Sequence, residues 1–422
     1  MEKEEKQIFD NYTRVKVPEQ KTVSGIRIAG IIVGVGITLP VLFLGAEVTQ
    51  AVGIHTASWI FIGVCLVLSI LCGVTAIIGN RSRLSTYMLL HFSFGKKGAK
   101  LVNLIIGITL LGWYAVTIEI FGQALTDAFK QILNFNFPLM LSIILGSILM
   151  TTTALYGIKA MERLSSISVP LMLGFMIFVI ITAVNDKGWG HVLSIEGSNQ
   201  ISVMEAISAI VGMAILTPVL MPDYSRFART DKDSLISVLG LTIGFPIVLW
   251  AGGIPSLTTG EIDIMKIMIG LSLALPALFI LVFSTWTTNT ANLYSTVLTF
   301  STIFTKNNSW KIGIISSLIG TTLAIAGFAV YFIDFLNVMS ILIPPVSAIF
   351  IADFFFIRKQ STNLSDLDRL PSYNIAALIS WGVACIFALL GAYGFLTITS
   401  IAFFDSFVIG FGLYLLLQRI FS

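Results

Sequence analysis

The sequence predicts an all-α polytopic membrane protein with twelve transmembrane helices. Three observations carry this prediction: the composition, the number of long apolar runs and the distribution of Lys and Arg. The 422 residues are 56% hydrophobic and only 11% charged, with a mean hydropathy of +0.93. A soluble protein carries about 25% charged residues, so these charges are too few to cover a water-exposed surface. The net charge of +3 is also small, and no nucleic-acid partner is expected.

The apolar runs are counted against the thickness of a bilayer core, about 30 Å, which needs about 20 apolar residues per helix. Twelve runs meet this length, and in chain order they are spans 1 to 12. They lie at 26–49, 57–79, 101–124, 137–156, 165–184, 203–222, 235–254, 267–301, 312–331, 334–356, 374–392 and 396–418. Span 8 is longer than one bilayer thickness, so we expect it to be tilted or to extend past one interface.

The distribution of Lys and Arg fits this count. If the N-terminus is cytoplasmic, 22 of the 25 Lys and Arg residues fall on the cytoplasmic side, and only Lys130, Lys187 and Lys266 fall outside. Such an excess marks the cytoplasmic loops of membrane proteins. Both termini are therefore predicted to be cytoplasmic. The loops are too short to hold a soluble domain, which leaves a secondary transporter, a channel, a membrane-embedded enzyme or a scaffold.

Spans 1 and 6 share a pattern of Gly and Pro that indicates an internal repeat. Span 1 reads VGVGITLP over 33–40, and span 6 reads VGMAILTP over 211–218. Two inverted five-helix halves would place these spans at corresponding positions, where secondary transporters carry broken helices. Gly weakens a helix by about 1 kcal/mol and Pro removes an amide donor, so we expect both spans to unwind there. A simple proline kink in each helix is the alternative.

Span 8 carries a dense polar group, STWTTN, at 284–289 inside an apolar helix. Neutral hydroxyls, together with carbonyls freed in a broken helix, can coordinate a sodium ion. The alternative is that these hydroxyls bond back to carbonyls of their own helix, as is common in membrane helices. The candidate sodium ligands are Ser284, Thr287 and Thr288, with the unwound turn near Gly34 and Ile37.

Several motifs, in order along the chain, resemble the cytosine permease-type members of the nucleobase–cation symporter family 1. The resemblance runs from about residue 22 to residue 418. The motifs are His91-Phe92-Ser93-Phe94-Gly95, Gly112-Trp113-Tyr114, Pro222-Asp223-Tyr224-Ser225-Arg226-Phe227, Trp286-Thr287-Thr288-Asn289 with Leu293-Tyr294, and Ile343-Pro344-Pro345-Val346 with Ile351-Ala352-Asp353. Together they are more specific than any one alone.

The resemblance implies a leucine-transporter-type fold, in which two inverted five-helix repeats are followed by two further helices. The implied organisation is a cytoplasmic tail at 1–24, a first repeat at 25–184, a second repeat at 203–356 and two accessory helices at 372–418. Family members couple uptake of nucleobases, hydantoins, allantoin or related ring compounds to sodium or protons. By resemblance this chain is therefore expected to be a symporter.

The resemblance also implies the residues of two sites. A sodium site would use the carbonyls of Gly34 and Ile37 with Thr287, Thr288 and Ser284, in agreement with the hydroxyl chemistry above. Trp113 matches the family's ring-stacking tryptophan, and a flat heterocycle gains about 0.5–1.5 kcal/mol from such contact beyond its buried area. The candidate substrate-binding residues are Trp113, Thr117, Thr38, Met213, Ala214, Leu216, Ser284, Asn289 and Glu119.

The chain departs from the cytosine permeases at several of these positions. Where span 6 of that group offers a second aromatic face and small hydroxyls, this chain has Met213, Ala214 and Leu216. Leu110 replaces a glutamine, and Ser284 aligns with an asparagine that contacts the base. Losing hydrogen-bond partners of a substrate changes discrimination strongly, so the mechanism is better predicted than the substrate.

Two acids, Glu47 in span 1 and Glu119 in span 3, stand where the cytosine permeases carry neutral residues. An intramembrane carboxylate is a functional candidate by default. We expect one or both to face the outer vestibule and to favour a cationic or donor-rich substrate, or to carry a proton. The alternative is a carboxylate near the interface that is satisfied by water or by Trp59.

These observations together predict a symporter of the plasma membrane, in contact with lipid, that imports a small nitrogen heterocycle such as cytosine by alternating access. Na+ is the expected coupling ion. Proton coupling and a non-nucleobase, donor-rich or cationic substrate are alternatives, and a channel is less favoured. The spans contain no His/Asp/Glu metal set or nucleophile–base pair, so an enzyme is not expected.

Overall fold

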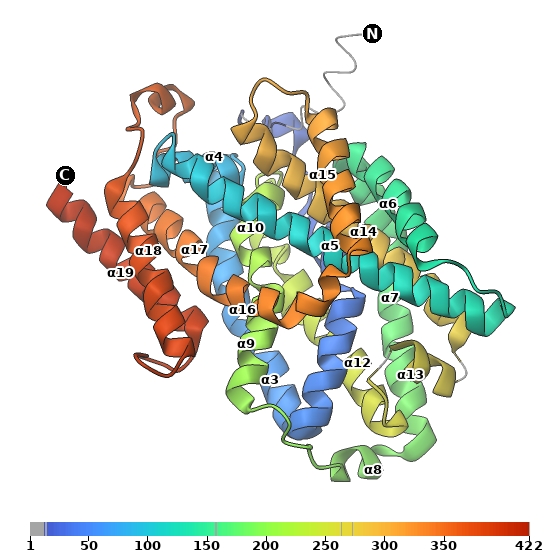
Figure 1. Cartoon of the computed structure of the whole chain (residues 1–422). Helices are drawn as coiled ribbons and strands as arrows, with labels where there is room; N and C mark the ends of the chain where they lie inside the picture. Colours follow the sequence, from blue (N-terminus) through green and yellow to red (C-terminus); the bar gives the residue numbers. More distant parts are fainter. Residues whose placement is uncertain (1–11, 13–14, 157, 263, 272, 422) are drawn as a thin grey trace, which may run out of the picture.

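The computed structural model describes residues 12, 15–156, 158–262, 264–271 and 273–421. Helices account for nearly all of the apolar sequence (Figure 1). Within the described ranges the structure contains no β-sheet, and one isolated bridge joins Val23 to Ala228. Most of the predicted tail (1–11 and 13–14) lies outside the described residues.

The first half of the chain forms the helices α2 to α8. Their bounds are α2 Gly25–Gly36, α3 Leu39–Ser82, α4 Thr86–Phe94, α5 Gly98–Leu133, α6 Leu139–Leu155, α7 Ile158–Lys187 and α8 Trp189–Ser194, preceded by the short η1 Glu19–Lys21.

The second half forms α9 to α19. Their bounds are α9 Val203–Ala214, α10 Leu216–Ser225, α11 Asp231–Ile236, α12 Phe245–Thr259, α13 Ile264–Gly270, α14 Ala274–Ile303, α15 Ser309–Ile325, α16 Phe332–Leu342, α17 Pro344–Ala352, α18 Ile375–Ala392 and α19 Ala402–Phe421. Four short helical segments complete the list: η2 Gly240–Gly244, η3 Phe328–Tyr331, η4 Asp353–Ile357 and η5 Leu364–Arg369.

Each predicted span overlaps one helix or two to three helical segments in succession, and span 12 begins six residues before α19. Eight helical stretches of the described residues are long and apolar enough to cross a membrane, and three shorter apolar helices accompany them. The 44 residues of α3 cover span 2 together with the outer half of span 1. The long run at 267–301 is divided between α13 and α14, which explains its excess length.

Span 1 is broken, as the Gly–Pro pattern predicted. Helix α2 ends at Gly36, and the backbone turns extended at Thr38 (φ −137°, ψ 155°) before α3 begins. The Thr38 hydroxyl accepts a hydrogen bond from the Val41 amide at 3.4 Å, which caps the new helix. Pro40 lies in the first turn of α3, where its missing amide breaks no helical bond.

Span 6 is interrupted only slightly, and the predicted unwound turn is wrong there. The residue between α9 and α10, Ile215, keeps helical dihedral angles (φ −61°, ψ −29°) and its amide bonds to Val211 at 2.8 Å. A Cβ at Gly212 would lie 2.7 Å from the Leu336 carbonyl oxygen. This glycine therefore allows close packing of α9 against α16 rather than unwinding. Span 1 has Gly36 at the position where span 6 has Ala214, the better helix former.

Helix α3 is kinked at Gly53, whose φ of 76° lies in the left-handed region. There the second half of span 1 turns directly into span 2. The corner is bound to the chain after α8, because the amides of Ser198 and Asn199 donate to the carbonyls of Gln50 (2.9 Å) and Ala51 (2.8 Å). Glycine is the residue that adopts this backbone at little cost.

Helices α3 and α12 pack backbone to backbone. A Cβ at Gly45 would collide with the backbone of Leu249, and one at Gly252 with the backbone of Leu42. Small residues at such contacts are typical of membrane helix pairs. The second half of span 1 is thus packed closely against span 7.

A second group of helices is joined by hydroxyl groups. The Tyr114 hydroxyl of α5 lies 3.0 Å from both Ser147 of α6 and Ser317 of α15, and Ser147 lies 2.6 Å from Thr321. The amide of Asn289 in α14 donates to the Tyr114 carbonyl at 3.1 Å. Helix α5 runs across this group (Figure 1). Because the bonds lie inside an apolar bundle, they fix α5, α6, α14 and α15 as one scaffold.

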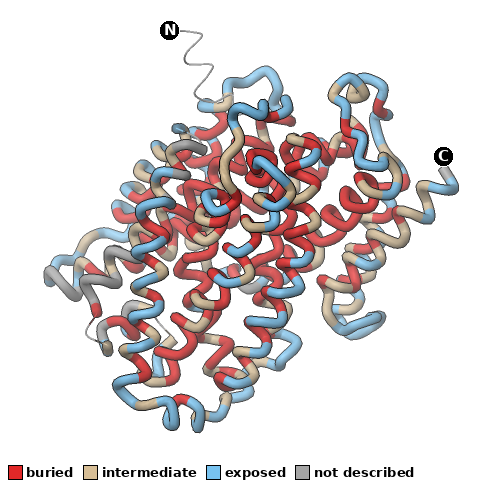
Figure 2. Tube along the Cα trace, turned by 180° about the vertical axis from the view of Figure 1, so that it is seen from behind, coloured by how far each residue is buried: buried red, intermediate tan, exposed pale blue. Residues whose placement is uncertain are grey.

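Loops that carry Lys and Arg residues are joined at one end of the bundle, where Lys96 donates to the Asp368 carbonyl at 3.0 Å and Arg358 to the Phe92 carbonyl at 2.7 Å. At this end, which we call the basic end, buried Arg226 donates to the carbonyls of Asp223 (3.0 Å) and Tyr12 (2.8 Å). Arg81 pairs with Asp231 at 2.7 Å. Figure 2 shows buried positions through the middle of the bundle and exposed loops at its ends.

Candidate functional site

The break in span 1 places carbonyl oxygens against two hydroxyls of α14. The Gly34 carbonyl accepts hydrogen bonds from Thr287 (3.1 Å) and Thr288 (3.2 Å), and Thr288 also donates to Val35 (3.2 Å). These carbonyls belong to the last turn of α2, where helical amide donors run out. The Thr287 hydroxyl is also 2.8 Å from the Ser284 carbonyl, so it bonds in part to its own helix as well.

This oxygen set has the chemistry of a sodium site. Its members are carbonyls and hydroxyls without a carboxylate, whereas Ca²⁺ and Mg²⁺ are held largely by carboxylates. Of the predicted ligands, Gly34, Ser284, Thr287 and Thr288 come together, and Ile37 is the buried residue at the break beside them. The carbonyl of Val35 was not predicted. The only signal for it was its place in the last turn before the break.

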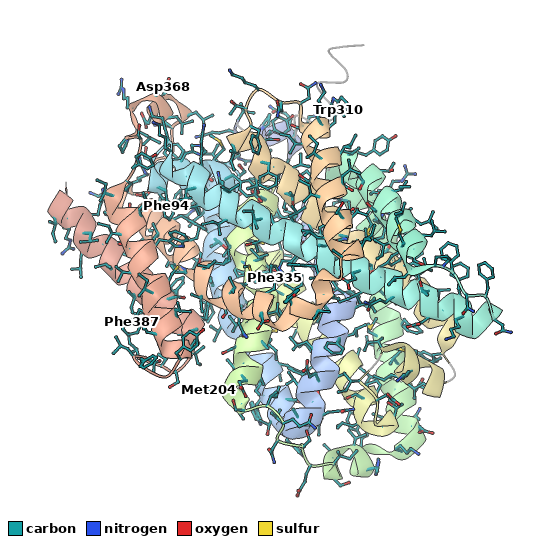
Figure 3. The ribbon with its side chains drawn as sticks, viewed as in Figure 1. Phe94, Met204, Trp310, Phe335, Asp368 and Phe387 are labelled. Carbon is teal, nitrogen blue, oxygen red and sulfur yellow. The ribbon has the colours of Figure 1, made fainter. Side chains whose placement is uncertain are left out.

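Trp113 lies on α5 in the middle of the bundle, 7% exposed. Two rings meet its indole edge-on, Phe332 with centroids 5.8 Å apart and Phe335 at 5.6 Å. Figure 3 shows Phe335 near the centre of the molecule, where α16 passes α5. The sequence analysis missed both phenylalanines, although their spacing of three residues, at the start of α16, places them on one helix face.

Two polar atoms beside this ring are buried without a hydrogen-bond partner. They are the indole Nε1 of Trp113 and the hydroxyl of Thr117, one turn further along α5. Buried polar groups are usually paired, and an unpaired one calls for an explanation such as a ligand. The two atoms lie on one face of α5 and provide a donor and a donor-acceptor for a small polar molecule.

The other predicted substrate residues are distributed around the same level. Met213, Ala214 and Leu216 are buried where α9 meets α10, Thr38 is buried at the break in span 1, and Ser284 is buried in α14 beside Thr287. Asn289 donates to the Tyr114 carbonyl and accepts from Asn292 at 3.3 Å. The nitrogen and the oxygen of the Asn289 side-chain amide are therefore both already hydrogen-bonded within the protein. Its role as a substrate contact stays a prediction.

Glu119 lines a cavity of about 430 Å³ at the end of the bundle away from the basic loops. The carboxylate is 4% exposed and accepts hydrogen bonds from the Ala329 amide (2.7 Å) and from Gln123 (3.4 Å). Asp127 lines the same cavity. Glu47 is half-buried, with its Oε2 unpaired, and does not line this cavity.

The cavity leads toward Trp113. Phe332 lines the cavity and also touches the Trp113 ring, and Leu39, directly after the extended Thr38, forms another part of the wall. Phe332 therefore separates the cavity from the indole. Glu119 holds the segment before Phe332 through the Ala329 amide.

Comparisons with known proteins identify the family of this chain. Residues 16–413 match the family of permeases for cytosine/purines, uracil, thiamine and allantoin. The chain is 28% identical to the cytosine permease of Escherichia coli K12, covering 88% of this chain and 87% of that protein. It is 24% identical to the hydantoin permease of Microbacterium maritypicum, covering 90% and 82%.

Solved structures share the fold. Mhp1, a nucleobase-cation-symport-1 family transporter in a closed conformation with bromovinylhydantoin bound, superposes with a TM-score of 0.86 at 19% identity, covering 97% of this chain and 95% of the other. A Na+-coupled sialic acid symporter gives a TM-score of 0.70 at 15% identity, covering 98% and 91%.

The predicted leucine-transporter-type fold is thereby confirmed. A family match over nearly the whole chain, on a bundle of apolar helices, identifies a multi-pass membrane transporter and not an enzyme. The chain belongs to the nucleobase–cation symporter family 1, the permeases for cytosine/purines, uracil, thiamine and allantoin.

Proposed function

We propose that this protein is a secondary active transporter that couples Na+ entry to the uptake of a nucleobase or related small nitrogen heterocycle. The observation that carries the proposal is the meeting of the Gly34 carbonyl with Thr287 and Thr288 at the break in span 1. The proposal places the protein in the plasma membrane with its basic end, and both termini, in the cytoplasm. The side of the Lys and Arg residues supports this orientation.

Coupling follows from where the ion ligands come from. Carbonyls of α2 belong to the broken helix, and the hydroxyls belong to α14 in the scaffold. An ion between them binds tightly only when α2 lies against α14. Only such differential binding can shift a conformational equilibrium, so Na+ would stabilise the arrangement in which α2 is docked.

The substrate would lie against Trp113. The indole face offers dispersion and aromatic contact to a flat ring, and the unpaired Nε1 and Thr117 hydroxyl offer hydrogen bonds. The relatives named for cytosine and hydantoin support a small cyclic compound with ring nitrogens. The aliphatic side chains of Met213 and Leu216 provide no second aromatic ring, so cytosine itself is one candidate among several heterocycles.

Transport into proteoliposomes tests the proposal. Purified protein should take up at least one of cytosine, uracil, adenine, hydantoin or allantoin in a saturable manner. An inward Na+ gradient should increase the initial rate relative to an equal K+ gradient, at constant pH. Uptake that follows a pH gradient and ignores Na+ would favour proton coupling, and a conductance without saturation would favour a channel.

A second candidate, a cationic or donor-rich substrate, is favoured by the acidic cavity. Glu119→Gln should weaken competition by a cationic heterocycle about tenfold relative to a neutral one, because a hydrogen bond to a charged group contributes about 1.5–3 kcal/mol. The Gln carbonyl can still accept from the Ala329 amide, so the variant removes the charge and keeps this bond.

Asp127→Asn is the matched control for Glu119→Gln. Asp127 lies eight residues along the same helix and lines the same cavity, without the bond to Ala329. A change in selectivity limited to Glu119→Gln would assign the role to that carboxylate. Unchanged selectivity in Glu119→Gln would leave Glu119 as a structural tie to the η3 segment.

A further inference from the structure

Helix α14 carries candidate ion ligands and α5 carries the candidate stacking ring, and one buried amide joins these two helices. The Nδ2 atom of Asn289 in α14 donates to the Tyr114 carbonyl in α5 at 3.1 Å, and both residues are fully buried. In the sequence, Asn289 directly follows Thr288, whose hydroxyl contacts the broken helix. Tyr114 directly follows Trp113. The bond therefore links the neighbour of an ion ligand to the neighbour of the indole.

The orientation of this amide is fixed from both sides. A backbone carbonyl can only accept a hydrogen bond, so the nitrogen of Asn289 has to face Tyr114. The amide oxygen faces the other way and accepts from Asn292, about one turn further along α14, at 3.3 Å. The side chain of Asn289 is thus held in one position between α14 and α5.

The partner of this amide is itself held in place. The Tyr114 hydroxyl lies 3.0 Å from Ser147 of α6 and 3.0 Å from Ser317 of α15. The Tyr114 carbonyl can bind Asn289 and keep its helical hydrogen bond, because a carbonyl oxygen has two lone pairs. Tyr114 is therefore a fixed point of the scaffold, to which Asn289 attaches α14.

A second buried amide joins the same two helices away from both candidate sites. Asn103 of α5 donates to the Thr302 hydroxyl of α14 at 3.0 Å, and both side chains are buried. Asn103 is 11 residues from Tyr114, which corresponds to about 16 Å along a helix. Contacts of this kind keep α5 and α14 together. What Asn289 adds is a fixed alignment of the helices at the level of the two sites.

A directional bond between two helices constrains them more than apolar packing does. Apolar side chains allow one helix to slide slightly along another, whereas a buried asparagine favours a single register. A slide that broke the bond to Tyr114 would leave the buried donor of Asn289 unpaired, which is costly. Asn289 therefore holds the ion ligands of α14 at a constant distance from the indole of α5.

We propose that Asn289 is a positioning residue through which bound Na+ strengthens substrate binding. Na+ would dock α2 against Thr287 and Thr288, and the break that follows α2 carries Thr38, a candidate substrate residue. Docking of α2 improves the substrate site only if α14 and Trp113 keep a fixed relation, which Asn289 provides. This role rests on the proposed function, and it makes Asn289 a link between the two sites rather than a contact of the substrate.

The test measures binding of a heterocycle to the purified full-length protein in Na+ and in an equal concentration of K+. The probes are cytosine, uracil, adenine, hydantoin and allantoin, and the quantity compared is the ratio of the two dissociation constants. In wild type, Na+ should strengthen binding of a transported compound about 5-fold or more, a typical coupling between two sites. Asn289→Leu keeps the shape of the side chain and removes both hydrogen-bonding groups, so the ratio should fall below about 2-fold.

This ratio separates the positioning role from two simpler roles. If Asn289 only contacts the substrate, Asn289→Leu lowers the affinity equally in Na+ and in K+, and the ratio keeps its wild-type value. If Asn289 only stabilises the fold, the unfolding temperature falls and the ratio again keeps its value. Either result would overturn the proposal. Asn289→Gln, which retains a donor and an acceptor, should retain part of the Na+ effect.

Asn103→Leu is the matched control, because it removes the other buried amide between α5 and α14. It should lower the unfolding temperature and leave the Na+ effect at its wild-type value. A Na+ effect reduced equally in Asn103→Leu and Asn289→Leu would indicate general loosening of the two helices and reject the assigned role. If Asn289→Leu does not fold, Asn292→Leu removes only the donor that orients the Asn289 oxygen and should reduce the Na+ effect in part.

Hydrogen exchange of backbone amides with Na+ alone tests the same role without a substrate. In wild type, Na+ should slow exchange in α2, in α14 and, through Asn289, in the part of α5 around Trp113. Asn289→Leu should lose the effect in α5 and keep it in α2. A Na+ effect missing from all three helices in wild type would contradict the sodium site and with it the proposed function. An effect in α2 and α14 that does not reach α5 would contradict only the role of Asn289.

Discussion

Thr288→Ala is expected to shift sodium-dependent substrate binding to much higher Na+ concentrations while expression and folding remain intact. The Thr288 hydroxyl lies 3.2 Å from both the Gly34 and Val35 carbonyls, so it contacts two carbonyls of the broken helix where Thr287 contacts one. An interaction with a charged group contributes about 1.5–3 kcal/mol, and its loss corresponds to about 10- to 100-fold weaker Na+ binding. Substrate binding measured across a series of Na+ concentrations gives this shift directly.

The control for this experiment is on the same helix. Thr296 is buried in α14, and its hydroxyl donates to the Asn292 carbonyl four residues earlier, at 2.8 Å. Thr296→Ala should therefore leave the Na+ dependence unchanged, and Thr288→Ser, which keeps the hydroxyl, should retain most of it. Normal Na+ dependence in both Thr287→Ala and Thr288→Ala would reject the assignment of the site.

Trp113→Ala should weaken binding of any transported heterocycle at least about tenfold, because an aromatic contact adds about 0.5–1.5 kcal/mol to the value of the buried area. The indole is also packed against Phe332 and Phe335, so its removal leaves a cavity that costs about 3–5 kcal/mol of stability. Binding has to be compared at a temperature where both proteins are folded.

Trp113→Phe separates the two effects. Phenylalanine keeps an aromatic face and most of the packing but lacks the Nε1 donor, which has no partner in the protein. Its affinity should fall between wild type and Trp113→Ala. Trp59→Ala, at a position on α3 that is 77% exposed, controls for the loss of a tryptophan. Unchanged affinity in Trp113→Ala would remove this residue from the binding site.

The number of crossings could be predicted from sequence because the bilayer leaves few alternatives. Backbone polar groups in lipid must be satisfied within the segment, so each crossing needs a long apolar helix. The sequence did not show how spans 1 and 2 are connected. At Gly53 span 1 passes into span 2 within α3, without a loop between them. The predicted end of one span and beginning of the next therefore fell inside one helix.

The Gly–Pro pattern predicted one break correctly and one wrongly, for a physical reason. A glycine can interrupt a helix, or it can let two helices approach closely. The sequence alone does not distinguish these two roles. Gly34 and Gly36 precede a real interruption, whereas Gly212 gives room for the Leu336 carbonyl. Packing partners decide between these roles, and a single sequence does not contain them.

The candidate ion site was within reach of the sequence because hydroxyls in an apolar helix are conspicuous. Ser284, Thr287 and Thr288 were found in this way, and their partner Gly34 followed from the break. Val35 contributes a backbone oxygen, which its apolar side chain does not reveal. Phe332 and Phe335 were hidden for a similar reason, since a phenylalanine in a membrane helix is ordinarily unremarkable.

The corner at Gly53 has a consequence for how force travels through the protein. From Leu39 to Ser82 the chain forms one helix with a single kink at Gly53, and the carbonyls just before this kink accept hydrogen bonds from the amides of Ser198 and Asn199. A displacement of the beginning of α3, beside Thr38, must either change the kink at Gly53 or move the second part of the helix. That part ends at Ser82, at the basic end of the bundle. In the proposed transport cycle, α3 would therefore connect a movement at the candidate site with a movement at the basic end of the bundle.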